Sequence, residues 1–314
     1  KQDSSRMSGR LKVAHSARER NDVFWLRHDV YVVEDGKFGG SPLPGSRIAD
    51  RFDALPRVAN LVAYDGDEPI GTLRVNLDTG GGLPSEEVYD FAAYRQALDR
   101  GHGQAVVLGS ASMLAIRRRW RGRRDVIKAM FKMATGIGHS WGATHGLATV
   151  NRDTISIYER LGFEALGEAV WVDAIGNYIV PMGGEFSAAY QWAFGDLINA
   201  RLDRFWLDAF SGHFERVLLA PGEGLFTEGD DAEHAYIVDE GWIQVVRRDS
   251  DGNQLTLATL SHGALLGELA LIDDRPRSAA AVAGTHVELI QLSRQDFLDS
   301  VRSDPEQVKR LLCV

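Results

Sequence analysis

The sequence of 314 residues has little cysteine, no long apolar run and no excess of positive charge. Its one cysteine, Cys313, cannot close a disulfide within the chain, so a reducing compartment such as the cytoplasm fits. No apolar stretch reaches the roughly 20 residues of a membrane helix, and we expect no integral membrane segment. The net charge of −9 disfavours nonspecific binding to nucleic acid. His102, His139 and His145 are scattered along the sequence, and we expect no metal site.

The chain is long enough for two domains, because its length exceeds what one ordinary hydrophobic core supports. Between residues 11 and 185, predicted strands alternate with predicted helices, which favours a mixed, partly parallel sheet with covering helices. Residues 186–210 are aromatic and helical in pattern, and we interpret them as a connector. Within 211–314, short strands recur with turn signals about every ten residues, which is typical of a small β-barrel (a jelly roll) or a sandwich. The sequence therefore predicts an α+β fold.

Several segments of the first domain have clear patterns. Val23, Leu26 and Val30 lie at helical spacings and predict an amphipathic helix over residues 21–35. The segments 57–64 and 68–77 flank a short polar turn and predict a β-hairpin. Within the predicted strand 105–116, Gly109 marks a place where a β-bulge fits. The other predicted strands are 146–150, 169–175 and 178–182, and the other predicted helices are 86–98, 125–138 and 153–161.

The stretch from Gly267 to Ala279 combines groups that can hold a phosphate and a ribose. Glu268 can accept hydrogen bonds from a pair of sugar hydroxyls. Arg277 offers a planar, bidentate fork to phosphate oxygens. The short apolar run between them suits one turn of helix. We interpret this stretch as a regulatory ligand clamp.

The region around this clamp, from about Phe210 to Val314, resembles the cyclic-nucleotide-binding domain. The matching residues include Pro221-Gly222, Glu228-Gly229-Asp230, Ala235-Tyr236-Ile237-Val238, Gly241, Gly263, Gly267-Glu268-Leu269-Ala270-Leu271 and Pro276-Arg277-Ser278-Ala279. The resemblance implies cAMP or cGMP as a regulator, with Glu268 on the ribose and Arg277 on the cyclic phosphate. It also implies that Gly267, Leu269 and Ala270 surround the ligand and that Ser278 adds a hydroxyl. Leu266 stands where the family has Phe, at a packing position. Few residues follow the last predicted strand, too few for a DNA-binding helix-turn-helix, so we expect no nucleic-acid partner.

The first half, from about Leu11 to Gly183, resembles the GNAT-type acyltransferases. Its clearest motif is Asn151, then Tyr158, then Leu161-Gly162-Phe163. The resemblance implies that Asn151 contacts the pantetheine arm and that the Tyr158 hydroxyl protonates the departing thiolate. A bulge near Gly109–Ser112 would direct backbone amides toward the thioester carbonyl, which places Ser112 at the cofactor. The alternative is that Tyr158 is a buried helix tyrosine with a packing role.

The arginine-rich segment departs from the phosphate loop of those acyltransferases. It has six arginines among the eight residues 117–124, and Arg124 and Val126 occupy positions where the loop has glycines. Arg121, Arg123 and Arg124 are the candidates to bind the pyrophosphate of coenzyme A or the acidic surface of an acyl carrier protein. The alternative is a solvated basic turn.

Further segments resemble two related families, the autoinducer (acyl-homoserine-lactone) synthases and the long-chain N-acyl amino acid synthases. These segments are Leu26–Tyr31, Asp50–Asp53, Gly71–Val75 and Ser112–Ile116. The autoinducer pattern expects Glu and Arg where this chain has Ser110 and Met113, and Trp where it has Lys37. The resemblance to the amino acid synthases is therefore the stronger one.

Together these patterns predict a cyclic-nucleotide-regulated N-acyltransferase. It would move an acyl group from an acyl-CoA or acyl-carrier-protein thioester to a small-molecule amine, a free amino acid being favoured. Tyr158 is the predicted general acid, and the general base is left between Asp50 and a water relay. Two alternatives stay open: a cAMP-regulated protein lysine acetyltransferase, and a catalytically inactive cyclic-nucleotide sensor.

Overall fold

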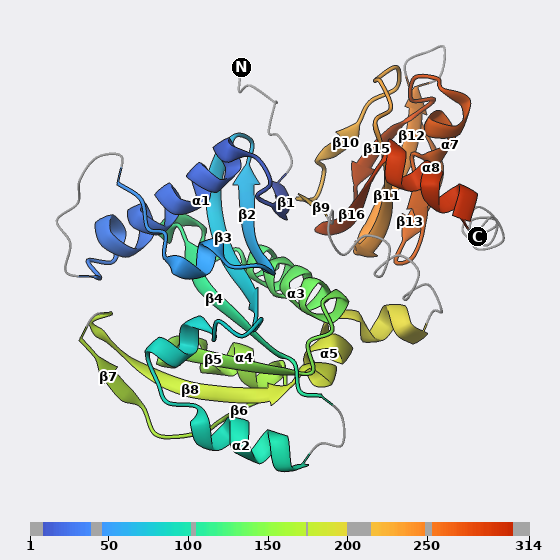
Figure 1. Ribbon diagram of the computed structural model, residues 1–314. Helices are drawn as coiled ribbons and strands as arrows, with labels where there is room; N and C mark the ends of the chain where they lie inside the picture. The colour runs from blue at the N-terminus through green and yellow to red at the C-terminus, as the bar shows by residue number, and fades with distance from the viewer. Residues whose placement is uncertain are drawn as a thin grey trace. The chain divides into compact units, whose positions relative to one another are not determined.

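The computed structural model describes residues 9–38, 46–101, 105–173, 175–199, 215–248 and 253–303. Its contacts divide the chain into two units (Figure 1). We call residues 13–63 and 69–198 the α/β unit, and residues 1–12, 64–68 and 199–314 the β unit. The mixed α+β fold class is confirmed. The helical connector predicted at 186–210 stays a prediction, because residues 200–210 lie outside the described part of the chain.

The α/β unit is built on a mixed sheet in the strand order β2-β3-β4-β5-β8-β6, with β7 also paired to β8. The predicted β2–β3 hairpin is present, and Gly66 takes the positive φ of its turn. β4 and β5 run parallel, whereas β3–β4, β5–β8 and β6–β8 are antiparallel. The strands are β2 Val58–Asp65, β3 Glu68–Leu77, β4 Leu108–Ile116, β5 His145–Asn151, β6 Phe163–Ala165, β7 Val170–Val172 and β8 Asn177–Glu185.

Helices α1 and α3 cover opposite faces of this sheet. On one face, Leu26 of α1 packs with Ala115 of β4. On the other face, Ile116 of β4 and Met130 of α3 lie near Gly71 of β3. A Cβ built on Gly71 would lie 2.6 Å from Ile116 Cδ1 and 3.4 Å from Met130 Sδ. Because successive strand residues point to opposite faces, Ala115 and Ile116 separate the two helices. The helices are α1 Ala17–His28, α2 Ala92–Gly101, α3 Arg124–Ser140, α4 Ile155–Arg160 and α5 Phe186–Asn199.

Side-chain caps determine where two of these helices begin. α1 starts earlier than predicted, because Ser16 and Glu19 form a capping box. It continues as a π-helix, Asp29–Glu34, so the predicted helical segment is confirmed over most of its length. α2 starts later than predicted, since Asp90 accepts a hydrogen bond from the amide of Ala92 at 2.8 Å. Short 3₁₀ turns occupy Arg51–Ala54, Pro84–Glu87, Arg118–Trp120 and Arg152–Thr154.

Helix α5 packs on α3 through glycines. A Cβ on Gly138 would lie 2.4 Å from the Phe186 ring, and one on Gly136 would lie 3.3 Å from Phe194. The absence of side chains at these glycines lets the two rings approach the α3 backbone. In the described part of the chain, no helix has both the length and the apolar composition needed to cross a membrane.

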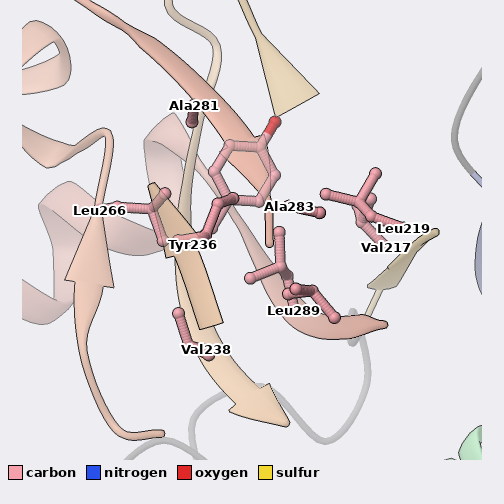
Figure 2. Close-up of a cluster of buried hydrophobic side chains, with 10 residues drawn as sticks. Val217, Leu219, Tyr236, Val238, Leu266, Ala281, Ala283 and Leu289 are labelled. Atoms are coloured by element: carbon pink, nitrogen blue, oxygen red, sulfur yellow. The ribbon is translucent and has the colours of Figure 1, made fainter. Parts of the chain in front are cut away.

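The β unit contains two sheets, with strand orders β14-β11-β16-β9-β1 and β10-β15-β12-β13. Val217, Val238 and Leu289 of the first sheet pack against Ile243 and Ala283 of the second (Figure 2). The unit is thus a sandwich of jelly-roll character rather than a closed barrel. Its elements are β1 Gly9–Val13, β9 Glu215–Leu219, β10 Gly224–Phe226, β11 His234–Glu240, β12 Trp242–Arg248, β13 Gln254–Ser261, β14 Leu265–Leu266, α7 Glu268–Asp273, β15 Ala280–Ala283, β16 Val287–Ser293 and α8 Arg294–Ser303.

The strand β1 joins the sheet of the β unit, although it precedes the whole α/β unit in sequence. It runs antiparallel to β9, with Gly9 opposite Leu218 and Leu11 opposite Arg216. An ion pair of 2.7 Å between Lys12 and Glu215 lies beside this pairing. The predicted first domain, residues 11–185, includes most of this strand, because the pattern of a strand does not show which strand it pairs with.

The same sheet holds a buried charge cluster centred on Arg216. This side chain is fully buried and donates to Asp239 at 2.6 Å and to Glu288. The two carboxylates come from β11 and β16, the strands that continue the sheet beyond β9. Burial lowers the pKa of Arg216, but the two carboxylates outweigh it and the pKa is raised. The cation therefore stabilises two anions that would be costly to bury alone.

We expect Arg216→Met to destabilise the β unit by about 3–5 kcal/mol, because two buried carboxylates lose their cation. Native-state hydrogen exchange of the β9 and β16 amides in the full-length chain measures this change. Lys12→Met is the matched control, since the Lys12–Glu215 pair is partly exposed and should contribute less than about 1 kcal/mol. Equal losses of protection in both variants would contradict the prediction.

Candidate functional site

A cavity of the α/β unit opens where β4 and β5 separate. The two strands are paired at Leu108–His145 and Gly109–Gly146, and in the described structure both continue without further pairing to each other. The cavity beyond this point has a volume of about 490 Å³, and we call it the main cavity. Its polar lining consists of Tyr31, Lys37, Asp50, Arg74, Ser85, Glu87, Ser112, Thr149, Asn151, Thr154 and Tyr158.

A β-bulge in β4 forms part of the cavity wall. Between the pairs Thr72–Ala115 and Arg74–Ser112, one residue of β3 faces two of β4, namely Met113 and Leu114. Met113 takes a positive φ of 55°, and Tyr31 Oη donates a hydrogen bond of 2.8 Å to the carbonyl of Leu114. The bulge thus lies beyond the predicted stretch 109–112. Sequence reasoning chose a glycine, whereas the conformation is taken by a methionine that tertiary contacts hold.

Tyr158 lies in the wall between the main cavity and a smaller one. Its ring, on α4, packs edge-on against Phe131 at 5.5 Å and Phe163 at 5.6 Å. The smaller cavity, of about 40 Å³, has a mostly apolar lining that includes both rings and Gly138. Burial raises the pKa of Tyr158, so the phenol keeps its proton at neutral pH. A general acid needs that form.

The main cavity also brings together two other predicted residues. Asn151, at the end of β5, accepts a hydrogen bond of 3.1 Å from Asn177 through its side-chain oxygen. Ser112 Oγ accepts one of 3.2 Å from Arg74 Nε. Ser112, Asn151 and Tyr158 all line the cavity, on β4, β5 and α4. Their predicted roles stay predictions.

The arginine-rich segment does not line this cavity. Arg121 donates to Asp35 at 2.9 and 3.0 Å, and Arg123 pairs with Asp125 at 2.8 Å. Arg124 is the exposed first residue of α3. Two of the three candidate phosphate ligands therefore have carboxylate partners in the chain. Their assignment to coenzyme A or a carrier protein stays a prediction.

Sequence reasoning missed a network of buried ion pairs beside the cavity. Arg27 and Arg74 are both fully buried. Arg27 donates to both oxygens of Asp53 at 3.0 Å. Arg74 donates to Asp53 at 3.0 Å and to Asp50 at 2.5 and 3.1 Å. Two cations and two anions balance, so the network is neutral. All four residues lie in the segments that resemble the synthase families. The sequence does not show which arginine binds which aspartate, because that depends on the fold.

Two opposing effects act on the pKa values of Asp53 and Arg27: burial favours the neutral form, and the opposite charge nearby favours the ionised form. Burial would raise the pKa of Asp53, but Arg27 and Arg74 outweigh it and hold the pKa below its ordinary value. Burial lowers the pKa of Arg27, and Asp53 opposes that effect. Asp53 is therefore an ionised anion throughout the physiological range.

In the β unit, Arg277 is buried beneath the predicted clamp. Its two Nη atoms donate to the carbonyls of Gly267 and His234, both at 2.6 Å. Its Nε is buried and has no partner in the described structure, and its guanidinium lies 4.3 Å from the centre of the Phe226 ring. Gly267 has φ of +79°, and a Cβ there would lie 2.6 Å from Arg277 Nη1. An unpartnered buried donor on a cation fits an anionic ligand such as a phosphate.

The other predicted clamp residues surround this point unevenly. Glu268 begins α7, and burial raises its pKa. Ala270 is buried, whereas Leu269 is 60% exposed and Ser278 is exposed. Leu266 lies in the core of the sandwich, as a packing position should (Figure 2). Among the described residues, no group of three or more potential ligands could hold a metal ion, and His102 lies outside them.

Known families match both units. Residues 22–185, just over half of the chain, match the family described as "N-acyl amino acid synthase FeeM". The chain belongs to the FeeM family. The matched range contains the whole lining of the main cavity, so the cavity is a feature of the FeeM-family region. Residues 216–304 match the cyclic nucleotide-binding domain, and this range contains Glu268 and Arg277.

Individual relatives resemble one unit each. The cyclic AMP receptor protein of Thermus thermophilus is 37% identical over 99 residues, which cover 32% of this chain and 46% of that protein. A cAMP-dependent protein kinase regulatory subunit of Yarrowia lipolytica is 33% identical over 95 residues, covering 27% and 24%. The chain thus spans less than half the length of these relatives. The solved structure of FeeM, an N-acyl amino acid synthase from uncultured soil microbes, is 16% identical with a TM-score of 0.46, covering 59% of this chain and 94% of that one.

We expect Asp53→Asn to lower the free energy of unfolding of the α/β unit by about 3–5 kcal/mol at neutral pH, because two buried arginines lose an anion. The pKa of Asp53 in the fold lies below its ordinary value of about 3.9. Its contribution is therefore complete above that value and is lost as the pH falls through the lower native pKa. The difference between wild type and variant should shrink only below about pH 4.

Urea denaturation of both proteins between neutral and acidic pH, followed by circular dichroism, measures this difference. The control is Glu87→Gln, which breaks an ion pair with Arg51 whose side chains are 55% and 53% exposed. That loss should stay under about 1 kcal/mol. A wild-type advantage over Asp53→Asn that is small, or that persists unchanged into acid, would contradict the assignment.

Proposed function

We propose that the protein is an N-acyl amino acid synthase controlled by a cyclic nucleotide. The observation that carries the proposal is the main cavity, which lies within the FeeM-family range and gathers Ser112, Asn151 and Tyr158 in its wall. The cavity volume of about 490 Å³ falls in the range of small-molecule sites. The acyl donor would be an acyl-CoA or acyl-carrier-protein thioester, and the acceptor a free amino acid.

In this reaction the acceptor amine attacks the thioester carbonyl, a C–N bond forms and the C–S bond breaks. Tyr158 Oη supplies the proton to the departing sulfur, since burial keeps the phenol protonated. The ammonium formed in the attack loses a proton, and water relays it to the phenolate, which restores the phenol. The bulge at Met113 and Leu114, which line the cavity, would offer backbone amides to the developing oxyanion. The chemistry is that of the GNAT-type acyltransferases.

The donor and the general base follow from the lining. Asn151 would contact the pantetheine arm, and the small apolar cavity beside Tyr158 would accept the start of the acyl chain. Asp50 lines the cavity, but both of its oxygens accept hydrogen bonds from Arg74. Both oxygens are thus engaged by the guanidinium and are poorly placed to take a proton from the amine. We therefore assign the uptake of the amine proton to water.

Tyr158→Phe keeps the ring packing and removes the proton donor. We expect the rate of acyl transfer to fall by about 10²- to 10⁴-fold with little change in stability. Mass spectrometry of products from a mixed pool of acyl thioesters and amines, with single-turnover rates, measures it. An unchanged rate would remove Tyr158 from the chemistry. Acylation of protein lysines alone would favour a lysine acetyltransferase, and no binding of any acyl thioester would favour an inactive sensor.

For the β unit, we propose that Arg277 binds the cyclic phosphate of cAMP or cGMP and that Glu268 binds the ribose. The unpartnered Nε of Arg277 supports this, because a phosphate oxygen would satisfy it. The match of residues 216–304 to the cyclic nucleotide-binding domain supports it independently. The nucleotide would then bias the activity of the α/β unit through a difference in affinity between two states.

We expect Arg277→Ala to weaken cAMP binding by at least about 10- to 100-fold, because the phosphate loses a charged partner. Titration calorimetry with cAMP and with cGMP measures the affinity. Arg247→Ala, an exposed arginine on β12, is the control and should bind normally. Cyclic AMP should change the acylation rate of wild type and of Arg247→Ala, but not of Arg277→Ala. Equal affinities in all three proteins would refute the clamp assignment.

A further inference from the structure

Two cations line the main cavity, Lys37 and Arg74. Arg74 is fully buried, and its donors are occupied by Asp50, Asp53 and Ser112. It is also balanced in charge within the Arg27–Asp53 network. Four of its five N–H donors are used in these hydrogen bonds, so Arg74 is largely committed within the network. Lys37 is the other source of positive charge along the lining.

Lys37 is positioned by its own backbone and by its neighbour. Its amide donates a hydrogen bond of 2.7 Å to the carbonyl of Tyr31, and the Phe38 ring packs edge-on against the Tyr31 ring at 5.5 Å. The Lys37 ammonium lies 5.9 Å from the centre of that same ring. These contacts hold Lys37 and Phe38 against Tyr31, so Lys37 belongs to the cavity lining rather than to free solvent.

The carboxylate nearest to Lys37 is already occupied. Lys37 Nζ forms an ion pair with Asp35 Oδ2 at 3.7 Å, a separation beyond hydrogen-bond distance. Asp35 instead accepts two hydrogen bonds from Arg121, at 2.9 and 3.0 Å. An ammonium has three donors, and this geometry leaves them available. Its side chain is 23% exposed, so the charge is partly desolvated and interacts strongly with an anion.

The anions of the lining do not neutralise Lys37 either. Asp50 is bound by Arg74, and Glu87 pairs with Arg51 at 2.7 Å. The described lining thus has one cation whose nearest carboxylate is held by another residue, and each of its anions has an arginine. Along the described lining, a ligand that brings its own carboxylate meets an ammonium with available hydrogen-bond donors at Lys37.

We propose that Lys37 binds the carboxylate of the acyl acceptor, so that the enzyme selects amines that carry a carboxylate. The proposal rests on the proposed function, since it names the recognition of the acceptor in the same cavity. The ammonium donates to the carboxylate oxygens, and the acceptor amine is left to face the thioester. An amine without a carboxylate loses this contact and gains nothing from Lys37.

The test compares amino acids with their decarboxylated amines, using phenylalanine with phenethylamine and leucine with isopentylamine. In Lys37→Met, we expect KM for each amino acid to rise about 10- to 100-fold, as for loss of a hydrogen bond to a charged group, and kcat to change little. KM for each amine should stay within about twofold of wild type, because uniform binding to the carboxylate is all that is removed. Lys37→Arg should restore most of the preference for amino acids, and Lys128→Met, an exposed lysine on α3, should behave as wild type.

Equal effects on amino acids and amines, or no effect on either, would overturn the assignment. Calorimetric titration of phenylalanine and phenethylamine into the same variants supplies a readout that does not require turnover. Loss of phenylalanine binding in Lys37→Met supports the proposal even if the protein consumes no thioester. A lack of thioester consumption would count against the proposed function but not against the role of Lys37. Phenylalanine heats that are the same in wild type and variant, or absent from both, would overturn it.

Discussion

The ion pairs among Arg27, Arg74, Asp50 and Asp53 are the interaction on which the α/β unit depends. They connect helix α1 and strand β3 to the 3₁₀ turn Arg51–Ala54 and the Asp50 that precedes it. A hydrogen bond from Arg74 to Ser112 extends the network to β4, next to the bulge. Two guanidinium groups with no exposed surface are tolerable only with both carboxylates in place. Asp50 and Arg74 of this network line the main cavity, and because they pair with each other that part of the wall has no net charge. The proposed chemistry then depends on the polar groups of the lining that lie outside this network.

Elements with local patterns could be predicted from the sequence, and elements set by tertiary contacts could not. The β2–β3 hairpin follows from two strand patterns around Gly66, and α3 follows from its apolar face. The bulge in β4 has no such signal, because Met113 adopts a conformation that Tyr31 and the pairing of β3 impose. Likewise, α2 begins at Ala92 because of a cap from Asp90, which propensity alone did not locate.

The candidate site shows the same division. Glu268 and Arg277 could be proposed as ligand-binding residues because their whole clamp lies in one short stretch of sequence, and their roles stay predictions. Tyr158 and Asn151 also share a short motif, and both line the main cavity. The arginine segment suggested phosphate ligands, but its partners Asp35 and Asp125 become visible only in the fold, and Asp35 lies far away in sequence. In the sequence, Lys37 is notable only because it stands where the autoinducer pattern has Trp. Its proposed role depends on the fold, which shows that the neighbouring carboxylates bind arginines.

The pairing of β1 with β9 makes the β unit discontinuous in sequence: residues 13–63 and 69–198 are inserted after its first strand. During synthesis β1 leaves the ribosome early, whereas its neighbour β9 follows only after the entire α/β unit has been made. β9 lies between β16 and β1 in the sheet, so a fragment that begins at Glu215 would present the bare edge of β9. An open edge of this kind recruits other strands and promotes aggregation. The β unit is therefore poorly suited to being expressed alone from residue 215 onward, because its strand β1 is encoded before the α/β unit.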